Sequence, residues 1–166
     1  MKIRILSFSL LSVIAMLSWA WINKNQGTEN DWSDYLGGSN RNHYSTLRQI
    51  TPENVDQLKI AWTYSLPDSG QMQVNPLIID GVLYGVSASV QAFALDAATG
   101  KELWKFGDPL KHWSSTSRGV SYWQKGDDKR ILFTTGPSLW ALDANTGKPI
   151  DSFGENGKID LHKGLP

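Results

Sequence analysis

Hydrophobic and polar residues alternate along two stretches of this chain, residues 74–106 and residues 118–153. A period of two over four to eight residues is typical of β-strands with one buried face. Asp80 and Gly81 interrupt the first stretch, and an Asp-Gly pair between apolar runs is a strong signal for a two-residue hairpin turn. Each stretch therefore predicts a four-stranded antiparallel meander, with strands at residues 74–79, 82–86, 90–95 and 101–106, and at residues 118–123, 130–135, 138–142 and 148–150.

A tight turn with nearly the same residues occurs in both stretches. Residues 94–101 read Ala-Leu-Asp-Ala-Ala-Thr-Gly-Lys, and residues 141–148 read Ala-Leu-Asp-Ala-Asn-Thr-Gly-Lys, 47 residues further on. In such a turn the aspartate accepts hydrogen bonds from nearby amides, and the glycine supplies the positive φ. A fixed period of this size among short strands predicts a repeat architecture, the blades of a β-propeller.

A lead-in segment, residues 31–66, precedes the first stretch. Thr51 and Pro52 predict a short helix over residues 51–58, because threonine is favoured at the N-cap and proline at the first helical position. Residues 59–66 are then expected to form a strand that Pro67 ends.

The N-terminal residues predict export. Residues 5–22 are 18 residues without a charge, and they follow a basic start with Lys2 and Arg4. This length lies between the core of a signal peptide and a membrane-spanning helix. Ser18 and Ala20 have the small-x-small form of a cleavage site, whereas the neighbouring bulky residues disfavour cleavage, so both outcomes stay open. We expect residues 1–22 to be a hydrophobic helix, either signal peptide or membrane anchor, residues 23–30 to be a linker, and the rest to lie in the periplasm.

Composition limits the chemistry. The chain has no cysteine, which excludes disulfides and thiolate metal sites, and its 16 basic and 16 acidic residues give no sign of a nucleic-acid partner. His43, His112 and His162 lack metal-ligand spacing, and Asp127 and Asp128 read as a solvated turn. We therefore expect no catalytic residue and no metal ligand within this sequence.

Length limits the architecture. Residues 23–166 comprise 144 residues, about three repeats of 47, whereas closed propellers need roughly four to eight blades. We therefore expect an N-terminal piece of a longer protein, inactive alone.

The repeated turn resembles the tryptophan-docking repeat of the pyrroloquinoline quinone (PQQ) dehydrogenases. The pattern Ala-x-Asp-x-x-Thr-Gly-x-x-x-Trp is complete from Ala94 to Trp104, while in the second copy Asp151 stands where the tryptophan belongs. In that family the tryptophan of one blade stacks on the turn of a neighbour. Residues 32–62 are also similar to the family's first segment, whose strand completes the last blade. The resemblance implies an all-β, PQQ-type propeller, present in part: lead-in segment 31–66, blade 74–106 and blade 118–153.

Arg118 is the strongest candidate for a ligand contact. It begins Arg-Gly-Val-Ser-Tyr, at the start of a strand expected to line the central channel. A guanidinium donates paired hydrogen bonds to carboxylate or quinone oxygens. The segment resembles the family strand whose arginine contacts the quinone oxygens of PQQ, and a surface salt bridge is the alternative. By the same resemblance Gln73 and Thr134 are further cofactor-binding candidates, with a plain strand threonine as the alternative for Thr134.

The resemblance also implies a function. It indicates oxidation of an alcohol, polyol or aldose by hydride transfer to PQQ, with electrons passing to a quinone or cytochrome. Calcium is implied as a second cofactor, and its ligands and the catalytic aspartate are expected beyond residue 166. Alcohol-oxidising members carry adjacent cysteines where this chain has His112 and Trp113, which favours the sugar- or polyol-oxidising branch. A cofactor-free propeller that serves as a binding or assembly scaffold is the alternative function.

Overall fold

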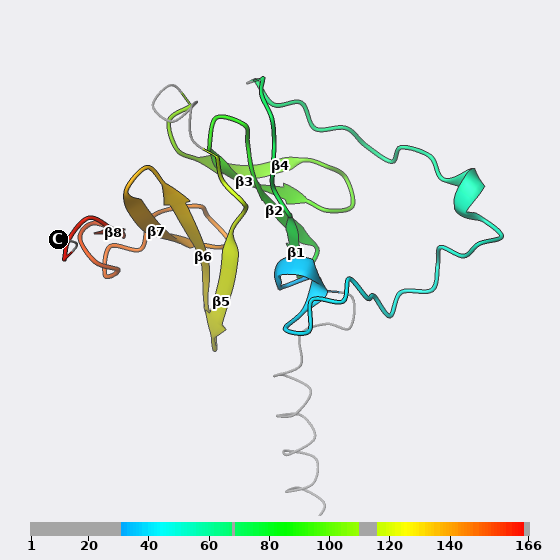
Figure 1. Cartoon of the computed structure of the whole chain (residues 1–166), viewed down its shortest axis with the longest axis horizontal. Coiled ribbons are helices and arrows are strands. Elements are labelled where there is room, and N and C mark those ends of the chain that lie inside the picture. Colours follow the sequence, from blue (N-terminus) through cyan, green and yellow to red (C-terminus); the bar gives the residue numbers. More distant parts are fainter. Residues whose placement is uncertain (1–30, 68, 110–115, 165–166) are drawn as a thin grey trace, which may run out of the picture. The chain divides into compact units, whose positions relative to one another are not determined.

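The computed structural model describes residues 31–67, 69–109 and 116–164, which belong to the compact unit Asp31–Pro166. The described residues form two four-stranded antiparallel sheets, each in sequence order (Figure 1). The first sheet contains β1 (Leu77–Ile79), β2 (Val82–Val86), β3 (Ala92–Asp96) and β4 (Glu102–Phe106); the second contains β5 (Ser121–Lys125), β6 (Asp128–Thr135), β7 (Ser138–Asp143) and β8 (Lys158–Asp160). Two short 3-10 helices precede them, η1 (Tyr35–Gly37) and η2 (Val55–Gln57).

The predicted Asp-Gly hairpin joins β1 to β2. Asp80 and Gly81 have φ values of 51° and 76°. Positive φ at both central residues is the signature of the type I′ turn, whose twist matches that of the flanking strands. The hairpin prediction is therefore confirmed.

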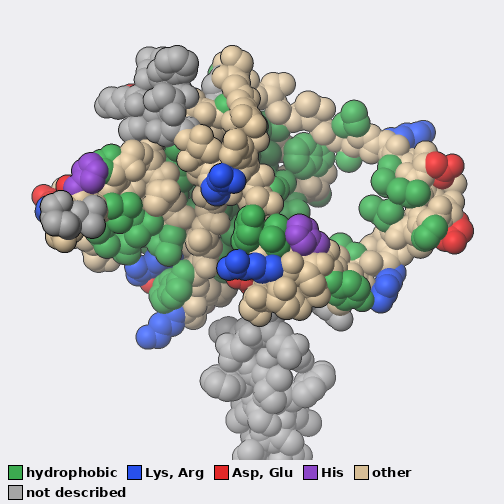
Figure 2. Space-filling model, in the orientation of Figure 1, with side chains coloured by type: hydrophobic (Ala, Val, Ile, Leu, Met, Phe, Trp, Pro, Cys, Tyr) green, Lys and Arg blue, Asp and Glu red, His purple; other side chains and the backbone are tan. Residues whose placement is uncertain are grey.

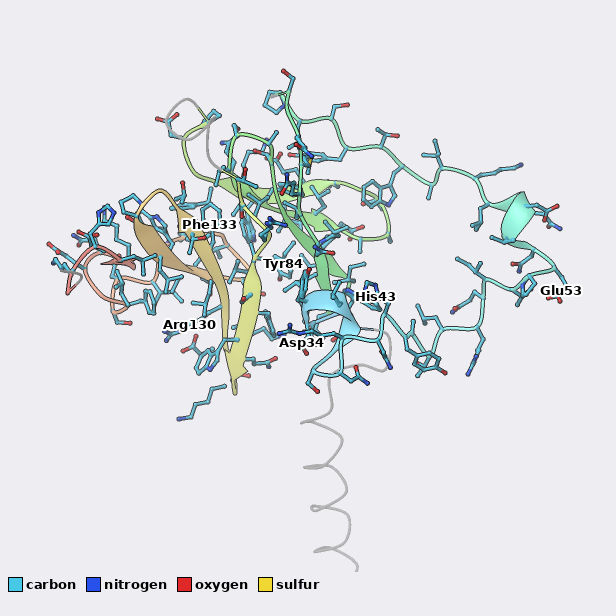
Figure 3. All side chains as sticks on the ribbon, in the orientation of Figure 1. Asp34, His43, Glu53, Tyr84, Arg130 and Phe133 are labelled. Atoms are coloured by element: carbon cyan, nitrogen blue, oxygen red, sulfur yellow. The ribbon has the colours of Figure 1, made fainter. Side chains whose placement is uncertain are left out.

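The two sheets share one hydrophobic core. Tyr84 from β2 and Phe133 from β6 both lie between the sheets (Figure 3), and Phe133 is almost completely buried. Phe106 packs edge-on against Phe133 with ring centroids 6.4 Å apart, and the Tyr84 hydroxyl donates to the Ala144 carbonyl (3.3 Å). Along β6 the odd-numbered residues Ile131, Phe133 and Thr135 are buried, so the period-two pattern directs one face of the second sheet toward the first.

The repeated sequence forms the same turn twice. In the first docking turn (residues 96–100) Asp96 Oδ1 accepts from the amide (2.8 Å) and the hydroxyl (2.6 Å) of Thr99. In the second docking turn (residues 143–147) Asp143 Oδ1 accepts from the same two groups of Thr146, both at 2.8 Å. These bonds fix the turn locally, which explains why its sequence predicts it so well.

A tryptophan docks on each turn. The Trp104 indole N–H donates to the Ala144 carbonyl (2.9 Å), and the Trp62 indole N–H donates to the Ala97 carbonyl (3.1 Å). The ring planes lie so close that a Cβ on Gly147 or Gly100 would stand 2.5 Å or 2.4 Å from an indole carbon. Trp104 therefore links the first sheet to the second, and Trp62 ties the lead-in segment to the first sheet. The sequence alone did not identify Trp62 as a docking residue.

The fourth strand of the second sheet was predicted wrongly. Residues 148–150 form only an isolated bridge between Pro149 and Leu142, and the strand is β8 instead. Phe93 and Trp140 are equivalent positions in the two repeats, 47 residues apart. Lys105 and Lys158, which pair with them on the fourth strands, are 53 residues apart. The difference is a bulge of six residues, 151–156. Pairing with β7 extends past Pro149, since the Ile150 amide donates to the Ala141 carbonyl (2.9 Å), and residues 151–156 then leave the sheet before β8 begins.

The lead-in segment also differs from its prediction. Residues 59–66 are not a strand: Tyr64 packs against Phe93 of β3 with ring centroids 5.4 Å apart, but none of the described strands pairs with the backbone of this segment. The helix predicted over residues 51–58 is reduced to η2. Many apolar side chains of this segment are exposed (Figure 2). They include Leu47, Ile50, Val55, Leu58 and Ile60, the last with 85% of its surface exposed.

The predicted hydrophobic helix over residues 1–22 and the linker at residues 23–30 lie outside the described residues. Among the residues that are described, no helix is long and apolar enough to cross a membrane.

Candidate functional site

The segments that lead into the two sheets meet at Asn75 and Gly119. These two residues form an isolated parallel bridge, and the Asn75 amide donates to the Arg118 carbonyl (3.4 Å). Gly119 has a φ of +131°, and a Cβ built on it would stand 3.0 Å from the Asn75 carbonyl oxygen. Only glycine allows this approach without strain. The bridge brings the backbone at Arg118 beside the segment that carries Gln73, so two of the three predicted site residues come from neighbouring segments.

Arg118 lies three residues before β5 rather than within a strand. Its side chain is exposed and has no hydrogen bond or ion pair with any other described residue. Val120 and Tyr122, which follow it, pack against the shared core, and burial raises the pKa of the Tyr122 phenol. The segment therefore combines packing residues that anchor it with one guanidinium that the described part of the chain leaves free to bind a ligand.

Gln73 and Thr134 have different surroundings. Gln73 is half-buried and stands two residues before Asn75. Thr134 is exposed on β6, opposite Leu139, between the buried residues Phe133 and Thr135. Because side chains alternate along a strand, Thr134 points away from the face that packs on the first sheet. Thus the fold aligns the segments of Gln73 and Arg118, whereas the Thr134 hydroxyl lies on the other face of the second sheet.

Buried polar groups at the β2–β3 turn were not singled out from the sequence. Ser87 and Ser89 are buried with their hydroxyl oxygens 3.1 Å apart. Gln91 Nε2 donates to the Gly107 carbonyl (2.9 Å), while Gln91 Oε1 has no partner among the described residues. Val90 has a φ of +63°, which is unusual for a β-branched residue. The sequence signal at this turn was three polar residues, Ser87, Ser89 and Gln91, that alternate with Ala88 and Val90 between two apolar strands.

In the described part of the chain, neither histidine belongs to a cluster of metal-ligating side chains. His43 is exposed, and His162 Nδ1 lies 3.9 Å from Asp160 Oδ1 with most of its side chain in solvent. His112 lies outside the described residues. Within residues 31–67, 69–109 and 116–164, no three His, Asp or Glu side chains are grouped so that they could hold a metal ion.

Two meander sheets joined by a tryptophan that docks on a repeated turn define a piece of a β-propeller of the tryptophan-docking type. Residues 32–166 match the PQQ family described as "Glucose/ethanol/alcohol dehydrogenase, beta-propeller domain". The chain belongs to this family, and the predicted all-β, PQQ-type propeller fold is confirmed.

The similar proteins include characterised dehydrogenases. The chain is 39% identical to the dehydrogenase subunit of a quinone alcohol dehydrogenase from Gluconobacter oxydans, over 76% of this chain and 17% of that protein. It is 34% identical to quinoprotein glucose dehydrogenase A from Acinetobacter calcoaceticus, over 83% of this chain and 21% of that protein. The structure is similar to quinohemoprotein alcohol dehydrogenase from Comamonas testosteroni, with a TM-score of 0.70, 27% identity, and coverage of 89% and 22% of the two chains. The chain thus spans about a fifth of the length of these relatives.

Proposed function

We propose that residues 31–166 are part of the propeller of a PQQ-dependent dehydrogenase, and that Arg118 binds the cofactor. The exposed guanidinium of Arg118, which is uncommitted among the described residues, carries the proposal. PQQ, when bound, supplies a quinone that accepts hydride from an alcohol, polyol or aldose. The family to which the chain belongs and the names of its relatives, which act on alcohol, glucose or glycerol, support this substrate class.

The donor set at the site suits an acidic quinone. Arg118 offers a planar fork of N–H donors for carboxylate or quinone oxygens. The Gln73 amide, on the neighbouring segment, can donate or accept a hydrogen bond. The Thr134 hydroxyl offers a third contact, although it stands on the other face of the second sheet. These residues bind and orient the cofactor, and the proposal assigns them no proton transfer.

The remaining parts of the reaction are assigned outside these residues. The proposal assumes calcium as a second cofactor, with its ligands and the catalytic aspartate beyond residue 166, and a quinone or cytochrome as electron acceptor. The family resemblance supports a sugar or polyol as substrate over a simple alcohol, because alcohol-oxidising members carry adjacent cysteines where this chain has His112 and Trp113.

Cofactor titration tests the proposal. In the complete protein, Arg118→Ala removes charge-assisted hydrogen bonds of about 1.5–3 kcal/mol each, so PQQ affinity falls roughly ten- to hundredfold. Arg118→Lys recovers part of this loss, because it keeps the charge but not the fork. Arg130→Ala is the matched control: this arginine, on β6 of the second sheet, is already paired with Asp128 Oδ2 at 2.6 Å.

The measurement is quenching of protein fluorescence as PQQ is added to apo-protein. Unchanged affinity in Arg118→Ala would show that Arg118 is a structural or surface residue. A wild-type protein that binds no PQQ would instead support the scaffold function.

We also propose that residues 5–22 direct export, so that residues 31–166 function in the periplasm, and that this segment is either a cleaved signal peptide or, if it is retained, a membrane anchor. The basic start and the uncharged run support this location. A reporter fused after residue 166 should be active only in its exported form; activity confined to the cytoplasm would contradict the proposal.

A further inference from the structure

The backbone of Arg118 is held on one side by a side chain. Ser117 Oγ accepts a hydrogen bond from the Gly119 amide (3.3 Å) and donates one to the Gly119 carbonyl (3.3 Å). A hydroxyl can do both at once because it carries one donor and two acceptor positions. Ser117 therefore bridges across Arg118 and fixes the peptide that follows it.

The other side is held by the neighbouring segment. The Arg118 carbonyl accepts from the Asn75 amide, and Gly119 stands against the Asn75 carbonyl at a distance that admits no side chain without a shift. Together the two contacts fix residues 117–119, while the Arg118 side chain itself is exposed. A fixed backbone beneath a free side chain is an arrangement that presents the side chain to a ligand.

We infer that Ser117 and Gly119 are positioning residues for the Arg118 guanidinium. This inference rests on the proposed function, in which Arg118 binds PQQ. A guanidinium fork binds two oxygens only from the correct orientation, and a fixed backbone lowers the entropy lost on binding. Ser117 and Gly119 thus raise cofactor affinity without touching the cofactor.

Single variants of the complete protein give the first test, by the same PQQ titration. Ser117→Ala should weaken PQQ binding about three- to tenfold, the effect of one or two neutral hydrogen bonds, and Ser117→Thr, which keeps the hydroxyl, should restore most of it. Gly119→Ala should weaken binding by about tenfold or more, because it must separate the two segments.

Gly126→Ala is the matched control for Gly119→Ala. Gly126 also has a positive φ, +62°, but nothing lies within 4 Å of a Cβ built there. It should therefore add left-handed backbone strain without a contact to a neighbouring segment, and leave PQQ affinity unchanged. Ser117→Ala keeps the test decisive if Gly119→Ala does not fold.

A double-mutant cycle separates positioning from general destabilisation. In an Arg118→Ala background, Ser117→Ala should have no further effect on PQQ affinity, because its contribution passes through the guanidinium. Additive losses, or a Ser117→Ala protein with wild-type affinity while Arg118→Ala is impaired, would overturn the inference and leave the proposed function intact. If Arg118→Ala itself binds PQQ normally, the proposed function fails and the inference fails with it.

Discussion

The two sheets begin alike and end differently. Their docking turns have the same hydrogen bonds, and each receives a tryptophan from the preceding segment. The first sheet then continues directly into β4, which carries Trp104 opposite Ala94. In the second sheet the equivalent Ala141 lies between Ile150 and Gly157, because residues 151–156 bulge out, and it has no tryptophan opposite it.

This difference shows that forming a docking turn and supplying a docking tryptophan are separate properties of a repeat. The turn is fixed by its own aspartate, threonine and glycine and forms whether or not the outgoing strand follows at once. The outgoing strand carries the link to the next repeat. The second sheet thus has a complete docking turn, which Trp104 occupies, although it lacks a tryptophan at the position equivalent to Trp104.

Removing the tryptophan by which the first sheet docks on the second should have the largest effect on stability. Trp104 is 8% exposed, so Trp104→Ala should lower the free energy of unfolding by about 3–5 kcal/mol. Trp62 is only half-buried, and Trp62→Ala should cost about 1–2 kcal/mol. The measurement is the urea midpoint of the complete protein, with the 42%-exposed Trp123→Ala as control. Equal losses for Trp104 and Trp123 would contradict the docking role.

Adding a side chain to the docking turn beneath the indole should have the next largest effect on stability. Gly147→Ala adds left-handed strain and a clash with Trp104, together about 2–4 kcal/mol. Gly81→Ala is the control, because Gly81 has a φ of +76° but open space around its Cβ position. It should cost only the strain, about 1 kcal/mol. Similar urea midpoints for the two variants would show that the indole does not require a glycine beneath it.

Acid should weaken the first docking turn, and this effect should be the smallest. The Thr99 hydroxyl and then the Thr99 amide lower the pKa of Asp96 below its ordinary value of 3.8. Because the folded-state pKa is the lower one, the stabilisation is complete above pH 3.8 and is lost as the pH falls through the folded-state value.

The urea midpoints of wild type and Asp96→Asn should therefore differ at neutral pH and converge in acid. Thr99→Val removes the hydroxyl donor and should raise the Asp96 pKa toward 3.8. A difference between wild type and Asp96→Asn that grows as the pH falls would contradict the sign of the shift.

Elements fixed by neighbouring residues could be predicted from the sequence. The Asp80-Gly81 hairpin and both docking turns depend on side chains and φ values within a few residues, and all three formed as expected. Residues 59–66 and 148–150 carry strand patterns too, but a strand needs a partner. Neither the missing partner of residues 59–66 nor the bulge before β8 is encoded locally.

The residues of the candidate site also differ in whether local sequence identifies them. Arg118 stood out because its five-residue segment resembles a family strand. Ser117 and Asn75 did not, because their roles follow from contacts with Gly119, one of which joins residues 44 positions apart. Trp62 was overlooked because its turn lies 35 residues later.

A structure of the complete protein with bound PQQ tests the central proposal most directly. We expect the Arg118 guanidinium to donate to carboxylate or quinone oxygens of PQQ at about 2.7–2.9 Å. We also expect the Ser117–Gly119 hydrogen bonds and the Asn75–Gly119 bridge to persist in that complex. Arg118 paired with a protein carboxylate, with PQQ beyond its reach, would contradict the proposed function.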